Sequence, residues 1–483
     1  MILLLLILIP FVAALLSWAA GAKSHGASRW IALCSMLVNL GIVIGIWMNH
    51  SQAPGQWWYI YKVDWVPHFG ISLHLALDGL NLLMLALTFF LGALSVMISW
   101  KEINTRVGFF HFNLLFVLCG ITGVFLTMDL FMFYFFWEMM LIPMYFLIGI
   151  WGHERREYAA NKFFLFTQAG GLLMLLAILG LYFIHAANTN VYTFNYFDLL
   201  HTSMDHATAR WLMLGFLVGF LVKLPAVPFH TWLPDAHTEA PTAGSVVLAG
   251  LLLKTGAYGI LRFVLPLFPA ASAEIAPVAM LLGVVGILYG GVLAFAQMDL
   301  KRLIAYTSVS HMGFVLLGAF AFNSIAYQGV VMQMITHGIS TGALFILAGA
   351  LYERIHTRNL HEMGGLWLKI PLMGTATMIF VMASLGLPGL GNFVAEFLVL
   401  LGSWQASHLL TILATTGLVI ATIYSLRIMQ RVFFGPCDRQ YALPDLGGRE
   451  LVIIVALILV ICWLGFHPQP VLHTSQNIGY VVR

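Results

Sequence analysis

Four ionisable side chains stand inside long apolar stretches of this sequence: Glu138, Lys223, Lys254 and Glu396. A charge at the centre of a bilayer costs roughly 2.5–3.5 kcal/mol or more unless it is paired or hydrated. Two acids and two bases therefore predict a shared polar interior. A buried lysine whose carboxylate partner can approach or withdraw would be a proton switch, because close pairing holds the proton on the lysine and separation releases it.

Two histidines extend this set. His311 lies in the run Ser-Val-Ser-His-Met-Gly, and His337 lies in Met-Ile-Thr-His-Gly. Imidazole titrates near neutrality and can both accept and donate a proton, which suits a relay. These six residues are the predicted proton-transfer site. Static ion pairs and hydrogen-bonded structural histidines are the alternative interpretation that the residue types leave open.

A polar segment at 229–242 holds His230, Asp235, His237 and Glu239. The spacing of the two histidines could place them on one helix face, as a metal site would need. A proline interrupts the segment, however, and no carboxylate completes a convincing ligand set. We therefore expect a hydrated mouth on the cytoplasmic side, and no metal site.

The elements that must position these residues are membrane helices. Of the 483 residues, 61% are hydrophobic and 8% are charged, whereas a soluble domain has nearer 25% charged residues. This composition excludes a water-soluble enzyme, a nucleic-acid binder and a disordered scaffold, and the net charge of +3 provides no large basic face. The four cysteines lack metal-ligand spacing, so neither disulfides nor an iron–sulfur or zinc site is predicted.

A helix needs about 20 apolar residues to cross the ~30 Å hydrocarbon core. Such stretches predict an all-α polytopic membrane protein with about fourteen transmembrane helices. They lie near 1–19, 29–49, 79–99, 108–127, 129–150, 162–184, 211–224, 241–266, 275–297, 301–321, 325–351, 369–386, 409–433 and 450–467.

Two of these spans are broken. The seventh stops at 225–228 and resumes to about Asp235, and the twelfth stops at 386–391 and resumes as 392–401. Helices five apart cross in opposite directions, which is the pattern of an inverted repeat around a transport pathway. Simple kinking by Pro and Gly is the alternative. The predicted divisions are helices 1–3 (1–107), helices 4–8 (108–268), helices 9–13 (269–435), and helix 14 with the tail (436–483).

The cations are distributed unevenly between the loops. Loops that follow even-numbered helices, with the tail, hold Lys62, Arg210, Arg262 and Arg483. Loops that follow odd-numbered helices hold Lys23, Arg29, Lys101, Arg106, Arg155, Arg156, Lys162, Lys301, Arg302, Arg354, Arg358, Lys369, Arg427, Arg431, Arg439 and Arg449. This asymmetry predicts that the odd loops face the cytoplasm and that both termini lie on the opposite side.

Motifs for redox chemistry are not found in the sequence. No glycine-rich dinucleotide fingerprint follows a predicted strand, and no phosphate-binding lysine loop occurs. We therefore expect no nucleotide, flavin, haem or iron–sulfur cluster in this chain. Any redox energy would have to come from partner subunits.

Three stretches of sequence carry a family resemblance. Residues 222–242, with Lys-Leu-Pro-Ala-Val-Pro-Phe-His-Thr-Trp-Leu-Pro-Asp-Ala-His, together with 253–256 and 305–313, are similar to the antiporter-like membrane subunits of respiratory complex I. The resemblance covers about helices 3 to 13. The same family includes subunits of multisubunit Na⁺/H⁺ antiporters and of membrane-bound hydrogenases.

Two features narrow the resemblance. Members of the L and N branches typically have Lys where this chain has Glu396. Members of the L branch are also typically longer and have an added helix that lies along the membrane. Both features favour the M branch, the counterpart of mitochondrial subunit 4. The resemblance implies that Glu138 and Lys223 form a pair and that Lys254 is the central lysine. It further implies that His311 and His337 bridge towards Glu396.

The resemblance also implies a function. A subunit of this kind would translocate protons within NADH:quinone oxidoreductase, driven by quinone reduction in partner subunits that hold the flavin, the iron–sulfur clusters and the quinone. Its partners would be other membrane-arm subunits, including two related antiporter-like subunits on either side, and membrane lipid, with no nucleic acid. It would lie in the bacterial inner membrane with both termini on the periplasmic side.

Two other functions stay open at this point, namely a Na⁺/H⁺ antiporter or membrane-bound hydrogenase subunit, and a structural subunit with a dead pathway. Glu396 disfavours the antiporter, because related antiporter subunits typically have Lys there. The intact set of charges disfavours the structural subunit.

Overall fold

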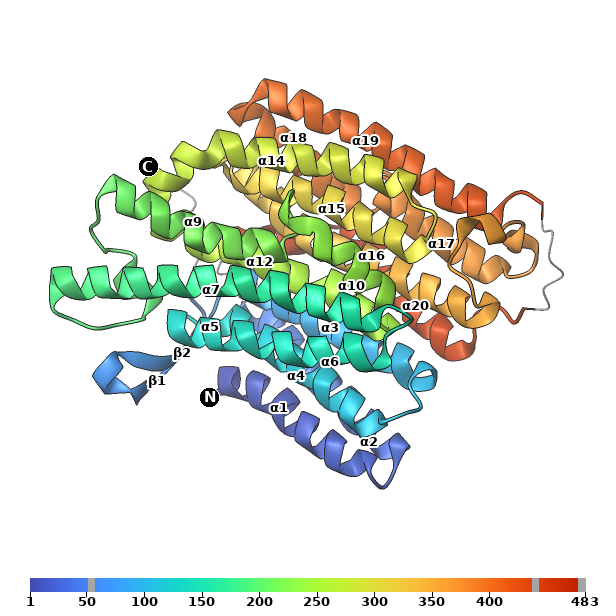
Figure 1. Ribbon diagram of the computed structural model, residues 1–483, viewed down its shortest axis with the longest axis horizontal. Coiled ribbons are helices and arrows are strands. Elements are labelled where there is room, and N and C mark those ends of the chain that lie inside the picture. The colour runs from blue at the N-terminus through green and yellow to red at the C-terminus, as the bar shows by residue number, and fades with distance from the viewer. Residues whose placement is uncertain (51–56, 437–442, 477–483) are drawn as a thin grey trace.

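The computed structural model describes residues 1–50, 57–436 and 443–476, which form a bundle of long helices (Figure 1). Cys437, Arg439 and Arg483 lie outside the described residues. Within the described ranges, eleven helical segments are long and apolar enough to cross a membrane. They are α1 (Ile2–Gly21), α2 (His25–His50), α3 (Gly79–Glu102), α4 (Val107–Leu126), α5 (Leu130–Met139) with α6 (Leu141–Trp151), α7 (Arg156–Thr189), the run from α11 to α13 (Thr242–Leu267), α14 (Pro269–Ala296), α16 (Ser324–Ile355), α19 (His408–Ile428) with η7 (Met429–Phe433), and α20 (Gly448–Phe466). The predicted class, a helical protein with many membrane-spanning segments, is confirmed by these eleven helices.

The other three predicted spans are also helical but less apolar or shorter. They correspond to α9 (His206–Lys223), α15 (Leu300–Ala319) and α17 (Pro371–Ser384). Helix α15 begins with two cations and carries a histidine among hydroxyl groups, and α17 has only 14 residues because the chain breaks after it. Four short helical elements lie outside the spans, namely α8 (Tyr196–Leu199), η5 (Leu360–Glu362), η6 (Leu366–Leu368) and α21 (Gln469–Ser475).

Both predicted helix breaks are present. Helix α9 ends at Lys223, and the chain resumes through η2 (Phe229–Thr231) into α10 (Trp232–Glu239). Helix α17 ends at Ser384, and α18 (Gly391–Ala406) follows. The second pieces are longer than predicted by four or five residues, because polar residues continue both helices beyond the apolar stretch.

The run from α11 to α13 is buried along its length except at Pro266, which is partly exposed. Two π-helical segments, η3 (Leu248–Leu252) and η4 (Ile260–Val264), flank the short α12 (Leu253–Gly259). A π turn shifts the hydrogen-bond ladder by one residue and is frequent at functional sites. Here the two π turns bracket the helix that carries Lys254.

An antiparallel hairpin between α2 and α3 was not anticipated from the sequence. Strand β1 (Tyr59–Val66) pairs with β2 (Ile71–Leu77), with Lys62 opposite His74. The turn, η1 (Pro67–Phe69), ends at Gly70 with φ of 66°, and a Cβ there would lie 1.9 Å from the Tyr192 carbonyl oxygen. Glycine is therefore required at this close approach.

The loops gather at two ends of the bundle, and the odd-numbered loops share one of them. The backbone amide of His153 donates to the Glu239 carbonyl at 2.9 Å, and Lys301 Nζ donates to the Ala240 carbonyl at 3.0 Å. At the other end, the Met128 amide donates to His74 of the hairpin. The segregation of loops that underlies the cation asymmetry is thus present in the fold.

Candidate functional site

Four of the six predicted site residues form one buried line of contacts. Lys254 Nζ lies 2.6 Å from Nδ1 of His337, whose ring centroid is 5.7 Å from that of His311. Nδ1 of His311 in turn lies 3.0 Å from Oε1 of Glu396. None of the four residues is more than 2% exposed. The line joins α12, α16, α15 and α18, which are distant in sequence.

Lys254 begins this line. Its ammonium donates to the Ala249 carbonyl at 2.5 Å, within the π-helical segment η3, and contacts His337 on its other side. Both partners are acceptors other than carboxylates. A proton can therefore leave Lys254 along its contact with the imidazole, which a static lysine–carboxylate pair would oppose.

His311 uses both of its ring nitrogens. Nδ1 faces Glu396, while Nε2 lies 3.1 Å from Ser384 Oγ and 3.3 Å from Tyr424 Oη. Sequence reasoning missed Ser384 and Tyr424. The available signal was weak, because serine and tyrosine are ordinary residues in membrane helices. Ser384 is the last residue of α17, directly before the break, and Tyr424 lies within α19.

Glu396 is held from two sides. Gln333 Nε2 donates to its Oε1 at 3.4 Å, beside the contact from His311. Gly386, in the break, has φ of +80°, and a Cβ at this position would lie 3.1 Å from Oε2 of Glu396. The break therefore brings backbone close to the carboxylate, and a larger residue there would crowd it.

Glu138 and Lys223 are not in contact as an ion pair in the structure. Lys223 Nζ is buried without a hydrogen-bond partner and lies over the rings of Trp137 at 5.5 Å and Phe163 at 5.3 Å. Oε1 of Glu138 also has no partner, and it lies 2.4 Å from the position of a Cβ on Gly171. Aromatic faces stabilise the ammonium in place of a carboxylate. The implied close pair is therefore absent from this arrangement.

The segment is buried from Trp232 to Thr242, whereas Thr231 at its start is exposed, so most of the expected mouth is closed in the isolated chain. Asp235 accepts an ion pair from Lys162 at 2.7 Å and a longer one from Arg302 at 3.5 Å. These cations of α7 and α15 cover the carboxylate that was expected to face water.

The two histidines of this segment do not converge. His230 faces the rings of Tyr289 and Tyr306, whereas His237 stacks on Phe345 at 4.5 Å. Neither ring nitrogen of His237 has a hydrogen-bond partner among the described residues.

Further basic side chains lie at the same end of the bundle. Lys301 is only 1% exposed although its sequence position suggested a loop. Burial, with Lys301 and Arg358 nearby, lowers the pKa of His153 in the α6–α7 loop to about 3. His153 is therefore neutral at physiological pH.

A buried ion pair at the opposite end was also missed. Arg262 Nη2 donates to Asp78 Oδ2 at 2.5 Å and to Asn81 Oδ1 at 2.9 Å, and the guanidinium lies 4.9 Å from the Trp57 ring. The distribution of cations predicts a loop position for Arg262, but the structure places it inside η4 with 2% exposure. The sequence feature that indicates burial of Arg262 is its position within the predicted span 241–266.

Comparison with known proteins defines the family. Residues 127–422 match the family described as NADH:quinone oxidoreductase/Mrp antiporter, TM. The chain is 54% identical over 488 residues to NADH-quinone oxidoreductase subunit M of Pseudomonas aeruginosa, covering 98% of this chain and 96% of that protein. It is also 54% identical over 486 residues to subunit M of Escherichia coli K12, with the same coverage.

Solved structures share the fold. A chain of respiratory complex I from Thermus thermophilus with bound NADH superposes with a TM-score of 0.89 at 30% identity, covering 98% of both chains. A chain of the Mrp complex from Dietzia sp. gives 0.86 at 22% identity, covering 97% of this chain and 95% of that one, which shows likeness of fold alone. The chain therefore belongs to the NADH:quinone oxidoreductase/Mrp antiporter family of membrane subunits, within its subunit M branch.

Proposed function

We propose that this chain is the proton-translocating, antiporter-like subunit of an NADH:quinone oxidoreductase and that protons pass between Lys254 and Glu396. The observation that carries the proposal is the buried line of contacts through His337 and His311. Each member can gain or lose a proton, and the family's relatives bear the name of that oxidoreductase.

The contacts suggest how a proton would move. Lys254 Nζ gives its proton to Nδ1 of His337, whose Nε2 has no hydrogen-bond partner and can release a proton in turn. A water or a ring rotation bridges the gap to His311. His311 then takes up the incoming proton at Nε2, the nitrogen that faces Ser384 and Tyr424, and gives the proton on Nδ1 to Glu396.

Glu138 and Lys223 would supply protons to this line of contacts or control when protons enter it. In the described arrangement Lys223 Nζ and Oε1 of Glu138 have no hydrogen-bond partner, and Lys223 is the last residue of α9 before the break. Their approach would hold a proton on Lys223, and their separation would release it. The separated arrangement is thus one of the two states that a switch requires.

We further propose fourteen crossings and an inverted repeat, of helices 4–8 (108–268) and helices 9–13 (269–435). Helices 1–3 (1–107), and helix 14 with the tail (436–483), would flank the repeat. Equivalent loops in the two halves of the proposed repeat make the same contacts, which supports the repeat. Asp129 caps α5 and forms a backbone bridge to Asn195, and Asp299 caps α15 and forms the same bridge to Asn359. The first bridge lies at the even-loop end of the bundle and the second at the odd-loop end.

The two breaks are matched in the same way. Beyond α9 the Ala226 amide donates to the Leu221 carbonyl at 3.0 Å, and beyond α17 the Leu387 amide donates to the Met382 carbonyl at 3.0 Å. Both bonds span five residues, and both follow the last helical turn. Corresponding breaks in two oppositely directed helices are the pattern of transport pathways.

The setting of the subunit follows from its family and its charges. The flavin, the iron–sulfur clusters and the quinone site would belong to partner subunits, so enzyme activity resides in the complex. Other membrane-arm subunits, including two related antiporter-like ones, and lipid would surround this chain. The loop cations favour a bacterial inner membrane with both termini on the periplasmic side.

Replacement of Lys254 tests the proposal. In the assembled complex, Lys254→Met should abolish most NADH-driven proton uptake, and Lys254→Arg should do the same because a guanidinium does not release its proton. Lys62→Met, on the exposed strand β1, is the matched control and should retain uptake. Normal uptake in both Lys254 variants would refute the line, and sodium transport in place of proton transport would favour an antiporter.

A further inference from the structure

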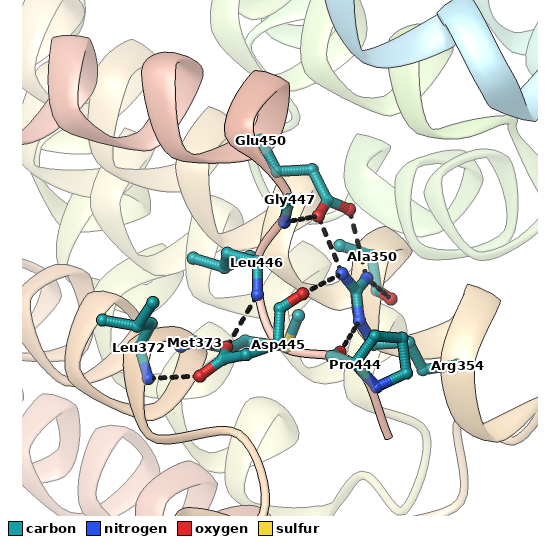
Figure 2. A network of polar contacts seen from close by, with 9 residues as sticks. All are labelled: Ala350, Arg354, Leu372, Met373, Pro444, Asp445, Leu446, Gly447 and Glu450. Atoms are coloured by element: carbon teal, nitrogen blue, oxygen red, sulfur yellow. Dashed lines mark hydrogen bonds and ion pairs between the residues drawn. The ribbon is translucent and has the colours of Figure 1, made fainter. Parts of the chain in front are cut away.

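The N-terminus of α17 receives its cap from a distant part of the chain. Its own N-cap residue, Ile370, has no side chain able to accept. Instead, Asp445 Oδ2 accepts the Leu372 amide at 2.8 Å, and Oδ1 accepts the Met373 amide at 3.1 Å (Figure 2). A carboxylate at this position satisfies orphan amides and complements the helix dipole. The position of α17 therefore depends on the loop that precedes α20.

That loop is held by a single arginine. Arg354, near the end of α16, uses all five N–H donors of its guanidinium. Nε donates to the Pro444 carbonyl at 2.8 Å, and Nη2 donates to the Asp445 carbonyl at 3.0 Å. Nη1 donates to the Ala350 carbonyl at 2.7 Å, and the remaining two donors reach the carboxylate of Glu450.

Glu450 completes the arrangement from the first turn of α20. Its Oε2 lies 2.7 Å from Arg354 Nη2 and also accepts the Gly447 amide at 2.7 Å. The two side chains are 9% and 11% exposed. Figure 2 shows Arg354, Asp445 and Glu450 meeting where α16, α17 and α20 approach one another. We call these three residues the clamp.

The other end of α17 reaches the proton-transfer line. Its last residue, Ser384, places Oγ 3.1 Å from Nε2 of His311. The helix has 14 residues and is about 21 Å long. A helix of this length behaves as a rigid element, so an anchor at one end sets where the other end lies. Ser384 is thus positioned by contacts that lie far from it.

We propose that Asp445 is a positioning residue for proton transfer, with Arg354 and Glu450 holding it in place. The clamp fixes α17 so that Ser384 stays on Nε2 of His311, which keeps Nδ1 directed at Glu396. The inference rests on the proposed function of that line.

The first test measures the anchor itself. In the assembled complex, Asp445→Ala should speed hydrogen exchange of the first amides of α17 about five-fold, the effect of losing a helix cap. Asp445→Asn keeps one acceptor oxygen and should show a smaller increase. Glu157→Gln removes an exposed charge from the same end of the bundle and should leave exchange unchanged. Unchanged exchange in Asp445→Ala would refute the clamp.

The second test measures protons taken up per NADH oxidised, in complexes normalised for assembly on a native gel. A merely structural role would lower complex levels and leave this ratio unchanged. The positioning role predicts a lower ratio in Asp445→Ala and in Arg354→Lys, since a lysine cannot reproduce five donors. Asp445→Asn should rescue part of the ratio.

Failure of this inference can be told apart from failure of the proposed function. Faster exchange with an unchanged ratio in Asp445→Ala would overturn the positioning role alone. An unchanged ratio in Lys254→Met would overturn the proton-transfer line, and the inference with it.

Discussion

Lys254 contacts a histidine ring: its Nζ lies 2.6 Å from Nδ1 of His337, and its other partner is a backbone carbonyl. A buried ammonium between two such acceptors is held less firmly than one facing a carboxylate. The contact therefore suits transfer, and the remaining members of the line can be tested one at a time.

Replacement of His337 separates binding of the lysine from relay of the proton. His337→Gln offers an amide oxygen to Lys254 but cannot pass a proton on, so the complex should assemble while NADH-driven proton uptake falls roughly ten-fold or more. His337→Ala would leave a buried donor without its partner and should also reduce complex levels. Full uptake in His337→Gln would exclude a relay role for this ring.

Glu396→Gln removes the ionisable group and nearly preserves its shape. We expect proton uptake to fall with assembly largely intact, because an amide oxygen can still accept from His311 and Gln333. Glu396→Lys should keep partial activity if a base can serve at this position, as the family resemblance implies. Exposed Glu274, replaced by Gln, is the control. Normal pumping at full turnover in Glu396→Gln would show that protons do not leave the pathway through α18, which carries Glu396.

The Glu138 and Lys223 variants distinguish a switch from a scaffold. Breaking a static buried pair costs about 3–5 kcal/mol, and neutralising both partners would restore assembly. Lys223 Nζ and Oε1 of Glu138 are not joined by a hydrogen bond in the structure, so Glu138→Gln or Lys223→Ala should leave the complex present but poorly coupled, and the double variant should be no better. Native-gel levels beside proton uptake decide the matter, and lost assembly rescued by the double variant would contradict the switch.

The Asp78–Arg262 pair behaves differently, because it is joined directly inside the bundle. Arg262→Met should destabilise the fold by about 3–5 kcal/mol, and the double variant with Asp78→Asn should recover much of the loss. Arg210→Met breaks an ion pair of similar length that is half exposed on both sides, and it should cost at most about 1 kcal/mol. Thermal unfolding of the solubilised complex measures both, and equal losses would contradict the burial argument.

His153 provides a pH-dependent test outside the membrane. Its pKa of about 3 lies below the usual 6.5, so the folded state disfavours protonation. The stability it contributes is present above about pH 6.5 and is lost as the pH falls towards 3, by at most about 1.4 kcal/mol per unit. His153→Gln should flatten the fall in unfolding temperature between pH 7.5 and 5.5, whereas exposed His206→Gln should not. An unchanged slope in His153→Gln would show that this ring is not the cause.

Local patterns predicted the parts of this fold that depend on local sequence. Apolar runs of the right length indicated the helices, and Pro and Gly indicated both breaks, since these depend on residues adjacent in the chain. The hairpin at β1 and β2 does carry a local signal, because Ile71-Ser72-Leu73-His74-Leu75 alternates between apolar and polar side chains. A search for apolar runs of membrane-spanning length does not detect strands this short.

The site could be predicted in part for the same reason. Charges within apolar runs stood out, so Lys254 and Glu396 were found, but Ser384 is an ordinary residue that matters only through its contact with His311. Asp445 caps a helix that begins more than seventy positions earlier, and no local pattern reports such a contact. Arg262 lies within the predicted span 241–266, but its ion pair with Asp78 could not be predicted because Asp78 lies in a different segment of the sequence.

Helix α7 has 34 residues, which corresponds to about 51 Å, and it extends beyond its neighbours at the left of Figure 1. The hydrocarbon core measures only ~30 Å. Even at a tilt of about 40° a helix of this length is longer than the core is thick, so one or both of its ends stand in headgroups or water. Asn188, near its end, is exposed. A cysteine introduced there would be open to a membrane-impermeant thiol reagent from one compartment only, which would establish the sidedness of the whole chain without reference to its activity.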